Sequence, residues 1–242
     1  VIEYNDDARV VVEWTNNRDL VVGEIDKKIT LGRRSQFVKA INLATEFFDK
    51  SNLENRHLVL VTDGLDSQSD EAVRAAAIKA LLSTNVNVHI FSYTKMEQMV
   101  VSQRYRSVQG GGTKRPDLPA GAEAPGQGRT QTSPIMTVNL DRAMIRKIRE
   151  RRDSLEKSEK ALTDLAKNTN GVLYLPDSRT EMIEKAFDLA RSIDANYVVT
   201  YVPKRPIENV RISEERNIEV SSRRGGLDVL ASRKLIVLPK PR

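Results

Sequence analysis

An acidic residue directly follows the most apolar strand-like run of the chain. Residues Leu58–Thr62 are apolar or β-branched with no polar alternation, and Asp63 and Gly64 come next. A strand that is apolar on both faces is typical of a parallel sheet with helices on each side. In such sheets ligands bind beyond the carboxyl ends of the strands, where we expect Asp63 to lie. Its carboxylate could hold a hard cation there, act as a general base, or cap the next helix.

Few other residues could form a catalytic centre. The chain has no cysteine and only two histidines, which excludes disulfides, thiolate chemistry and histidine-rich metal sites. We expect His89 to be hydrogen-bonded within a buried strand and His57 to lie at the surface. The sequence has no Gly-x-Ser-x-Gly elbow, so a serine hydrolase is disfavoured. The run Gly110–Lys114 lacks the spacing of a phosphate loop.

The basic character of the chain belongs to one segment. Residues 101–160 hold thirteen Lys/Arg against seven Asp/Glu, which accounts for the whole net charge of +6. The run Arg146–Arg152 could bind phosphate backbones or anionic lipid. Acidic residues are interleaved with it, and no aromatic residue accompanies it for base stacking, so a solvated helix face is favoured. We therefore expect no nucleic-acid partner.

Strand and helix signals alternate along residues 1–95, which we interpret as the first part of an α/β domain. We expect strands at 1–4, 9–14, 58–62 and 86–92, and helices at 19–29, 35–49 and 72–82. The first two strands form a hairpin, and the order of elements is that of an open α/β sheet. The apolar strands 58–62 and 86–91 are predicted to be central, with 9–14 as an antiparallel edge.

The pattern breaks in residues 96–139, which we interpret as a flexible Gly/Pro-rich insertion with little order between 108 and 133. The domain resumes over residues 140–202, where we expect a helix at 140–167, a strand at 172–175, a helix at 180–193 and a strand at 195–202. Residues 203–242 form a C-terminal β tail, with short strands at 207–212, 216–220, 227–231 and 234–237.

Three motifs, in this order and spacing, resemble a von Willebrand factor type A (VWA) domain. They are a helix start at Gly32–Ile41, the strand end Thr62-Asp63-Gly64, and a helix that runs into a strand over Leu162–Tyr174. The ending, with Asn196–Pro203 and then a short β tail, is similar to bacterial VWFA-related proteins. The resemblance implies a doubly wound, mostly parallel α/β sheet, Rossmann-like in its layers, with the insertion and the tail as additions.

The best-known site of this family is a metal-ion-dependent adhesion site that holds Mg²⁺. The resemblance assigns Asp63 to its aspartate position and Ser35 to its threonine position, and it thereby implies a Mg²⁺ cofactor. The family's Asp-x-Ser-x-Ser segment is not present in this chain, because its strand would precede Val1. Either the site is completed elsewhere, or Asp63 only caps the helix that follows it.

The resemblance places that first strand at the centre of the sheet. Without it, two neighbouring strands would leave a gap lined by unpaired backbone groups. We therefore expect upstream residues or another chain to supply a strand beside 58–62. The protein would then work within an assembly that also buries the helix at 140–167. Deletion of residues 108–133 should leave the α/β core folded but weaken this association.

The resemblance favours a non-enzymatic protein-binding or cell-adhesion module, with or without Mg²⁺, whose partners are proteins or neighbouring subunits. One alternative is a structural subunit without a metal site. Another is a phosphoryl-transfer or hydrolytic enzyme dependent on Asp63, which would need a second carboxylate and a positioned lysine. We assign no catalytic residue. No run of residues is long and apolar enough for a membrane helix. The resemblance and the processed-looking start, Val1, predict an extracytoplasmic location: periplasmic, secreted or at the cell surface.

Overall fold

The computed structural model describes residues 1–30, 32, 34–53, 55–67, 69–109, 134–194, 201–204, 206, 210, 212–226 and 232–237. Its elements are β1 (Ile2–Tyr4), β2 (Ala8–Val10), α1 (Arg18–Lys28), α2 (Phe37–Asp49), β3 (His57–Thr62), α3 (Glu71–Ser83), β4 (Asn87–Ser92), α4 (Thr94–Gln109), α5 (Pro134–Asn168), β5 (Leu173–Tyr174), α6 (Arg179–Asp194), β6 (Glu214–Glu219) and β7 (Ser232–Val237). Within these ranges no helix combines the length and apolarity needed to cross a membrane.

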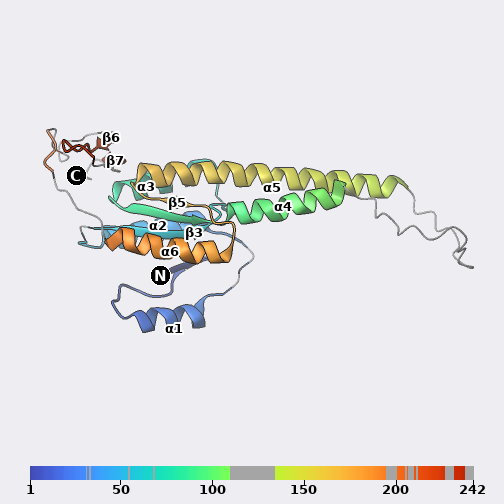
Figure 1. Cartoon of the computed structure of the whole chain (residues 1–242), viewed down its shortest axis with the longest axis horizontal. Helices are drawn as coiled ribbons and strands as arrows, with labels where there is room; N and C mark the ends of the chain where they lie inside the picture. The colour runs from blue at the N-terminus through green and yellow to red at the C-terminus, as the bar shows by residue number, and fades with distance from the viewer. Residues whose placement is uncertain are drawn as a thin grey trace, which may run out of the picture.

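A parallel sheet lies at the centre of the molecule. Its strand order is β3-β4-β5, and β3 pairs with β4 along its whole length, from His57 opposite Asn87 to Thr62 opposite Ser92. Helices α2, α3 and α5 cover one face, and α6 lies on the other (Figure 1). This arrangement confirms the predicted α/β class with a parallel sheet, and it directs the carboxyl ends of β3 and β4 to one edge.

The hydrophobic core lies between the sheet and the three helices on its first face. Helix α2 contributes an apolar stripe of residues at helical spacing, with Phe37 and Ile41 each 1% exposed. Leu162 of α5 packs into the same core. Ile236 of β7 also joins it, which attaches the C-terminal hairpin β6–β7 to the domain.

The prediction that both apolar strands are central is wrong for β3. β4 is central, but among the described strands β3 has a partner on one side only. The hairpin β1–β2 is antiparallel as predicted, yet it forms a separate two-stranded sheet. The side chains of β3 also alternate in exposure, with Val59 45% and Val61 56% exposed and Leu60 8% exposed, because successive side chains of a strand point to opposite faces of the sheet.

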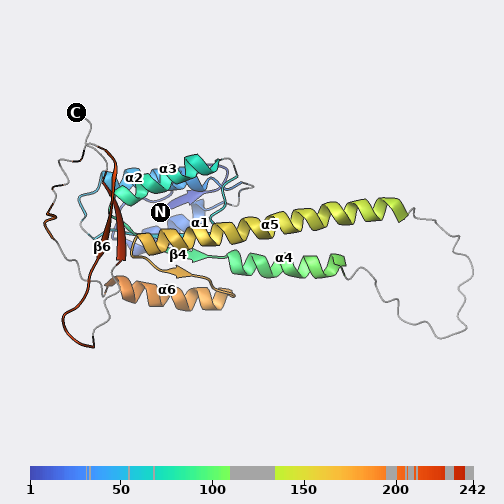
Figure 2. The same cartoon turned by 90° about the horizontal axis from the view of Figure 1, so that it is seen from above.

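The two ends of the segment interpreted as an insertion belong to two helices, α4 and α5, which pack side by side as a hairpin. Helix α4 was not predicted, and α5 begins at Pro134 rather than at residue 140. Residues 96–109 and 134–139 are therefore helical, whereas residues 110–133 lie outside the described part of the chain. α4 runs beside α5, where the side chain of Arg149 hydrogen-bonds to that of Tyr105. Figure 2 shows the pair extending away from the α/β body.

The rest of the chain follows the predicted order where it is described. The bounds of β5, α6, β6 and β7 agree with those of the predicted elements within one or two residues. β6 and β7 each begin two residues earlier than predicted. The predicted strands at 207–212 and 227–231, and residues 195–200 of the strand before them, lie outside the described residues, except Val210 and Ile212.

Candidate functional site

The carboxyl end of β3 is fixed by contacts from three directions. Thr62 is fully buried, and its hydroxyl accepts hydrogen bonds from the Tyr4 hydroxyl at 2.5 Å and from the Gly64 N–H at 2.8 Å. Gly64 has φ +68°, and a Cβ there would lie 2.5 Å from the Ser158 hydroxyl oxygen. Both the left-handed backbone and the close approach of α5 therefore require glycine after Asp63.

Both carboxylate oxygens of Asp63 have partners. Oδ1 accepts a hydrogen bond from the Leu65 N–H at 3.0 Å, and Oδ2 lies 3.4 Å from Nη2 of Arg151 on α5. The same Nη2 is 2.5 Å from Oε1 of Glu97 on α4. The Asp63 carbonyl also accepts a hydrogen bond from the Ser158 hydroxyl at 2.5 Å. The strand end is thus closed by α5.

The environment of Asp63 opposes its charge. The residue is 7% exposed, and burial raises the pKa of its carboxyl above the ordinary value. The Leu65 N–H lowers this pKa, the Glu97 charge raises it, and the Arg151 charge lowers it. Arg151 is therefore a nearby cation that favours ionised Asp63.

Ser35 lies at the same end of the sheet, but no contact joins it to Asp63. Its hydroxyl donates to the Leu65 carbonyl at 2.8 Å, and its N–H donates to the Ser67 hydroxyl at 2.9 Å. Ser35 does not cap α2, because the N-cap of α2 is Gln36, whose side chain makes no capping bond. Ser35 instead ties the start of α2 to the loop after β3.

Asp66 provides the helix cap that the sequence interpretation missed. Its Oδ2 accepts from the Val38 N–H of α2 at 2.8 Å, and its Oδ1 accepts from the Ser69 N–H at 2.8 Å. An acceptor for the free N–H groups of a first helical turn stabilises the helix. Arg74 of α3 lies over the Phe37 ring nearby, with its guanidinium carbon 5.3 Å from the ring centroid.

A sequence signal for the α5 contacts does exist. Arg151, Leu155, Ser158 and Leu162 follow one another at helical spacings of four, three and four residues, so they share one face of α5. Leu155 and Leu162 are buried on that face, at 0% and 1% exposed. A basic residue and a serine in line with buried leucines could have been recognised as facing the domain.

The described residues do not fit a Mg²⁺ ion at Asp63. Mg²⁺ prefers octahedral oxygen ligands, but both Asp63 oxygens are engaged, and a guanidinium, which repels cations, occupies the approach to Oδ2. In the described ranges no group of three Asp, Glu, His or Cys side chains could hold a metal. Asp63 and Ser35 therefore lie in one loop region without forming an ion cage.

The two histidines meet at the other end of the strands. Nδ1 of His57 lies 2.9 Å from Nε2 of His89, and the rings stack with centroids 5.2 Å apart. His89 is buried and hydrogen-bonded, as predicted, while His57 is partly buried. Neither ring is near Asp63, since His57 begins β3 and Asp63 follows its end.

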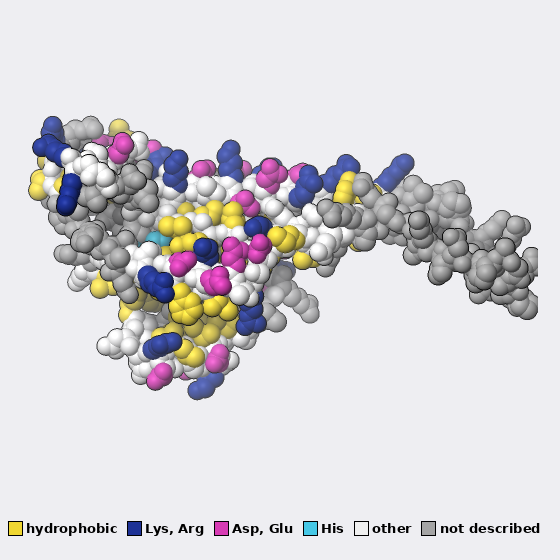
Figure 3. Space-filling view, viewed as in Figure 1, with side chains coloured by type: hydrophobic (Ala, Val, Ile, Leu, Met, Phe, Trp, Pro, Cys, Tyr) yellow, Lys and Arg dark blue, Asp and Glu magenta, His cyan; other side chains and the backbone are white. Residues whose placement is uncertain are grey.

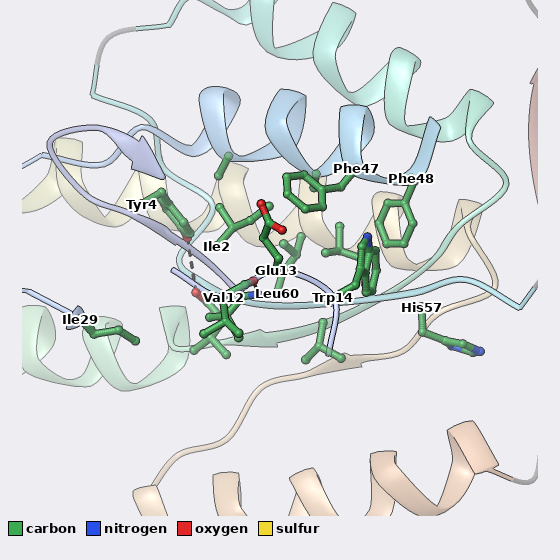
Figure 4. Close-up of a pocket in the computed structure, with 16 residues that line it drawn as sticks. Ile2, Tyr4, Val12, Glu13, Trp14, Ile29, Phe47, Phe48, His57 and Leu60 are labelled. Atoms are coloured by element: carbon green, nitrogen blue, oxygen red, sulfur yellow. Dashed lines mark hydrogen bonds between the residues drawn. The ribbon is translucent and has the colours of Figure 1, made fainter. Parts of the chain in front are cut away.

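An apolar groove of about 450 Å³ separates β1 from β3. Figure 4 shows its walls, with Ile2 and Tyr4 of β1 on one side and Leu60 of β3 on the other, and with Phe47 and Phe48 of α2 lining it. The Tyr4 hydroxyl reaches across and approaches the Val61 carbonyl at 3.4 Å. Paired strands lie about 4.8 Å apart, whereas here a whole tyrosine side chain spans the space between the two strands.

The backbone of β3 presents hydrogen-bonding groups to this groove. The Arg56 carbonyl accepts from Asn87 of β4 at 2.9 Å, so Arg56 faces β4. Successive residues of a strand direct their N–H and C=O groups to opposite edges, and Val59 and Val61 therefore face the groove. Exposed apolar side chains continue outside it, and Figure 3 shows them gathered between α6 and α1. Phe187 and Ile183 of α6 are 64% and 51% exposed.

One comparison with known proteins, with the models of protein families, supports the family resemblance. The model of the family described as von Willebrand factor type A domain matches residues 1–115. One solved structure that the chain resembles is an aerotolerance-related membrane protein from Bacteroides fragilis NCTC 9343 with multiple mutations to serines. The two are 19% identical with a TM-score of 0.39, and the match covers 81% of this chain and 78% of that chain. No curated protein matches the chain.

Proposed function

We propose that the chain is a non-enzymatic protein-binding module that acts within a larger assembly, because residues 1–115 match the model of the von Willebrand factor type A domain family. Domains of this family mediate protein interactions, which supports binding as the activity. The proposal includes an extracytoplasmic location, which rests on the likeness of the sequence to bacterial VWFA-related proteins. Fractionation of the source cells tests the location.

The observation that carries the proposal is the edge of β3 that no other described strand pairs with, beside an apolar groove. A strand edge offers a row of N–H and C=O groups, and an extended segment can add to it as a further strand. Val59 and Val61 supply both backbone groups and half-exposed apolar side chains for such a segment. The groove lining is apolar along Ile2, Leu60 and Phe47, so the added strand would carry apolar side chains.

Amide exchange tests this binding mode. The tagged chain is isolated with its native complex from the source cells, and exchange of the peptide covering His57–Thr62 is compared with that of the isolated chain. We expect slower exchange in the complex. The variant Val59→Pro removes the N–H that faces the groove but leaves the bonds to β4, and should recover less partner. Val73→Lys, at an exposed position of α3, is the matched control.

Equal exchange in the free and assembled chain would contradict the proposal. Protection that is already present in a monomer carrying additional upstream residues would assign the added strand to the same polypeptide instead of a partner. Loss of partner in Val59→Pro and Val73→Lys alike would point to a general defect.

An enzyme that uses Asp63 is the less favoured function. Its carboxylate is occupied by Leu65 and Arg151, and Lys95, the lysine at the end of β4, pairs with Asp177 at 3.6 Å. We expect no hydrolysis of p-nitrophenyl phosphate in the presence of Mg²⁺. Turnover that the Asp63→Asn variant abolishes would reverse this assignment.

A further inference from the structure

Three separate elements contribute to one ionic cluster at the end of β3. Nη2 of Arg151 on α5 lies between Oδ2 of Asp63, at 3.4 Å, and Oε1 of Glu97 on α4, at 2.5 Å. A single nitrogen atom thus contacts two carboxylates that are far apart in the sequence, one after β3 and the other on α4. The arrangement is that of a cation bridging two acids, with the cation supplied by the protein itself.

We propose that Arg151 takes the place of a divalent cation at Asp63, which makes the strand-end site a metal-independent anchor for the α4–α5 hairpin. The guanidinium is permanently charged and remains attached to α5. It lies 3.4 Å from Asp63 Oδ2, and the Leu65 N–H donates to Oδ1 at 3.0 Å. The anchor is independent of strand addition at β3 and stands even if that binding mode fails.

Further contacts on the same face of α5 hold Arg151 in position. Two turns along, the Ser158 hydroxyl donates to the Asp63 carbonyl at 2.5 Å. The next residue, Glu159, accepts from the Thr94 hydroxyl at the start of α4 at 3.1 Å. Leu155, between these polar residues, is fully buried. These contacts fix the position of α5 along the end of β3. They therefore hold Arg151 close to Asp63.

The burial of the three partners explains why a fixed cation is needed. The Asp63 side chain is 11% exposed, that of Glu97 33% and that of Arg151 42%. A carboxylate this buried loses much of its hydration, and an adjacent positive charge offsets the loss. Arg151 remains partly hydrated, so the cluster lies at the rim of the domain and not in its core.

The first test measures thermal unfolding of the full chain in EDTA, in 10 mM MgCl₂ and in 10 mM MnCl₂ at constant ionic strength. Tight binding of an ion to the folded state alone would raise Tm. We expect the same Tm within about 1 °C in all three solutions, for the wild-type chain and for Asp63→Asn alike. A rise that occurs with either ion in the wild-type chain but not in Asp63→Asn would overturn the proposal.

The second test is a double-mutant cycle of Arg151→Met and Asp63→Asn. Each single change should lower Tm by about 2–6 °C, and the double change should cost clearly less than the sum of the two. Fully additive losses would overturn the proposal. Arg151→Lys retains the charge and should lie between wild type and Arg151→Met, which also provides a milder variant if Arg151→Met folds poorly. Arg152→Met, one residue further along α5 and exposed, is the matched control.

Discussion

Gly171 lies so close to the backbone of β4 that even a methyl side chain would not fit there. A Cβ placed there would lie 1.8 Å from the Val88 carbonyl oxygen of β4. We predict that Gly171→Ala destabilises the chain by about 1–3 kcal/mol or more, because the backbone between α5 and β5 must move. Urea unfolding measures the loss.

The control for this change is Gly23→Ala in α1. A Cβ at Gly23 would have no atom within 4 Å, and the position is inside a helix. Alanine there should stabilise by about 0.5–1 kcal/mol. A loss of stability in both variants, or in neither, would show that the close approach at Gly171 is not what limits substitution.

The His57–His89 pair makes stability depend on pH. Burial, followed by the proximity of His57, lowers the pKa of His89 to about 4. An unfolded histidine takes up a proton near pH 6.5, whereas folded His89 resists protonation, so stability falls as pH falls from about 6.5 towards 4. We predict a loss of about 1–2 kcal/mol between pH 7 and pH 5.

Unfolding of the wild-type chain and of His89→Leu at both pH values checks this prediction. The variant should lose distinctly less stability on acidification, whatever its stability at pH 7. Equal pH slopes in the two proteins would mean that other groups cause the acid sensitivity.

At the residue scale, sequence predicted where Asp63 and Ser35 lie better than what they contact. An acidic residue after a buried apolar strand must appear at the strand end, because sheet geometry fixes that position. Its partner Arg151 is 88 residues away, and a contact at such separation depends on the docking of α5. The Asp66 cap was missed for a similar reason, since Asp66 caps α2 from a loop that follows β3.

At the scale of elements, the inner face of α5 should carry most of its packing energy. Leu162 is 1% exposed within the main core, whereas Met144, nearer the outer end of the helix, is 48% exposed. Leu162→Ala should cost about 2–5 kcal/mol, and Met144→Ala should stay within about 0.5 kcal/mol of wild type. Denaturant unfolding of the two variants compares the ends of the helix. Equal losses of stability in the two variants would indicate that Met144, in the outer part of α5, is also buried.

Elements with strong apolar periodicity were predicted well, and those supported by neighbours were not. α2 has its own stripe of buried residues and was located within two residues of its observed start. α4 has no comparable stripe and gains its support from α5, so its sequence resembles a polar linker. β3 was assigned correctly as a strand but wrongly as central, because an apolar run does not reveal whether both neighbours are present.

At the scale of the whole molecule, the exposed apolar side chains of α6 should promote association. Phe187 is 64% exposed and Ile183 is 51% exposed, and exposed apolar surface can mark an interaction site. Phe187→Gln should leave stability within about 0.5 kcal/mol of wild type while reducing self-association or partner binding. Sedimentation velocity over a range of concentrations measures the first, and recovery of the native complex measures the second. Unchanged association in both assays would remove this face from the assembly.

The hairpin of α4 and α5 also has a mechanical consequence. Arg151 fixes α5 part-way along its length, and the helix continues outward from there to Pro134. At 1.5 Å per residue this outer arm is about 25 Å long. A tilt of about 10° at the anchor would move the end of the arm by about 4 Å. The hairpin is therefore a lever that pivots at the strand end, so that a load on its outer end would act as a torque on Arg151 and on the Ser158 contact with the Asp63 carbonyl.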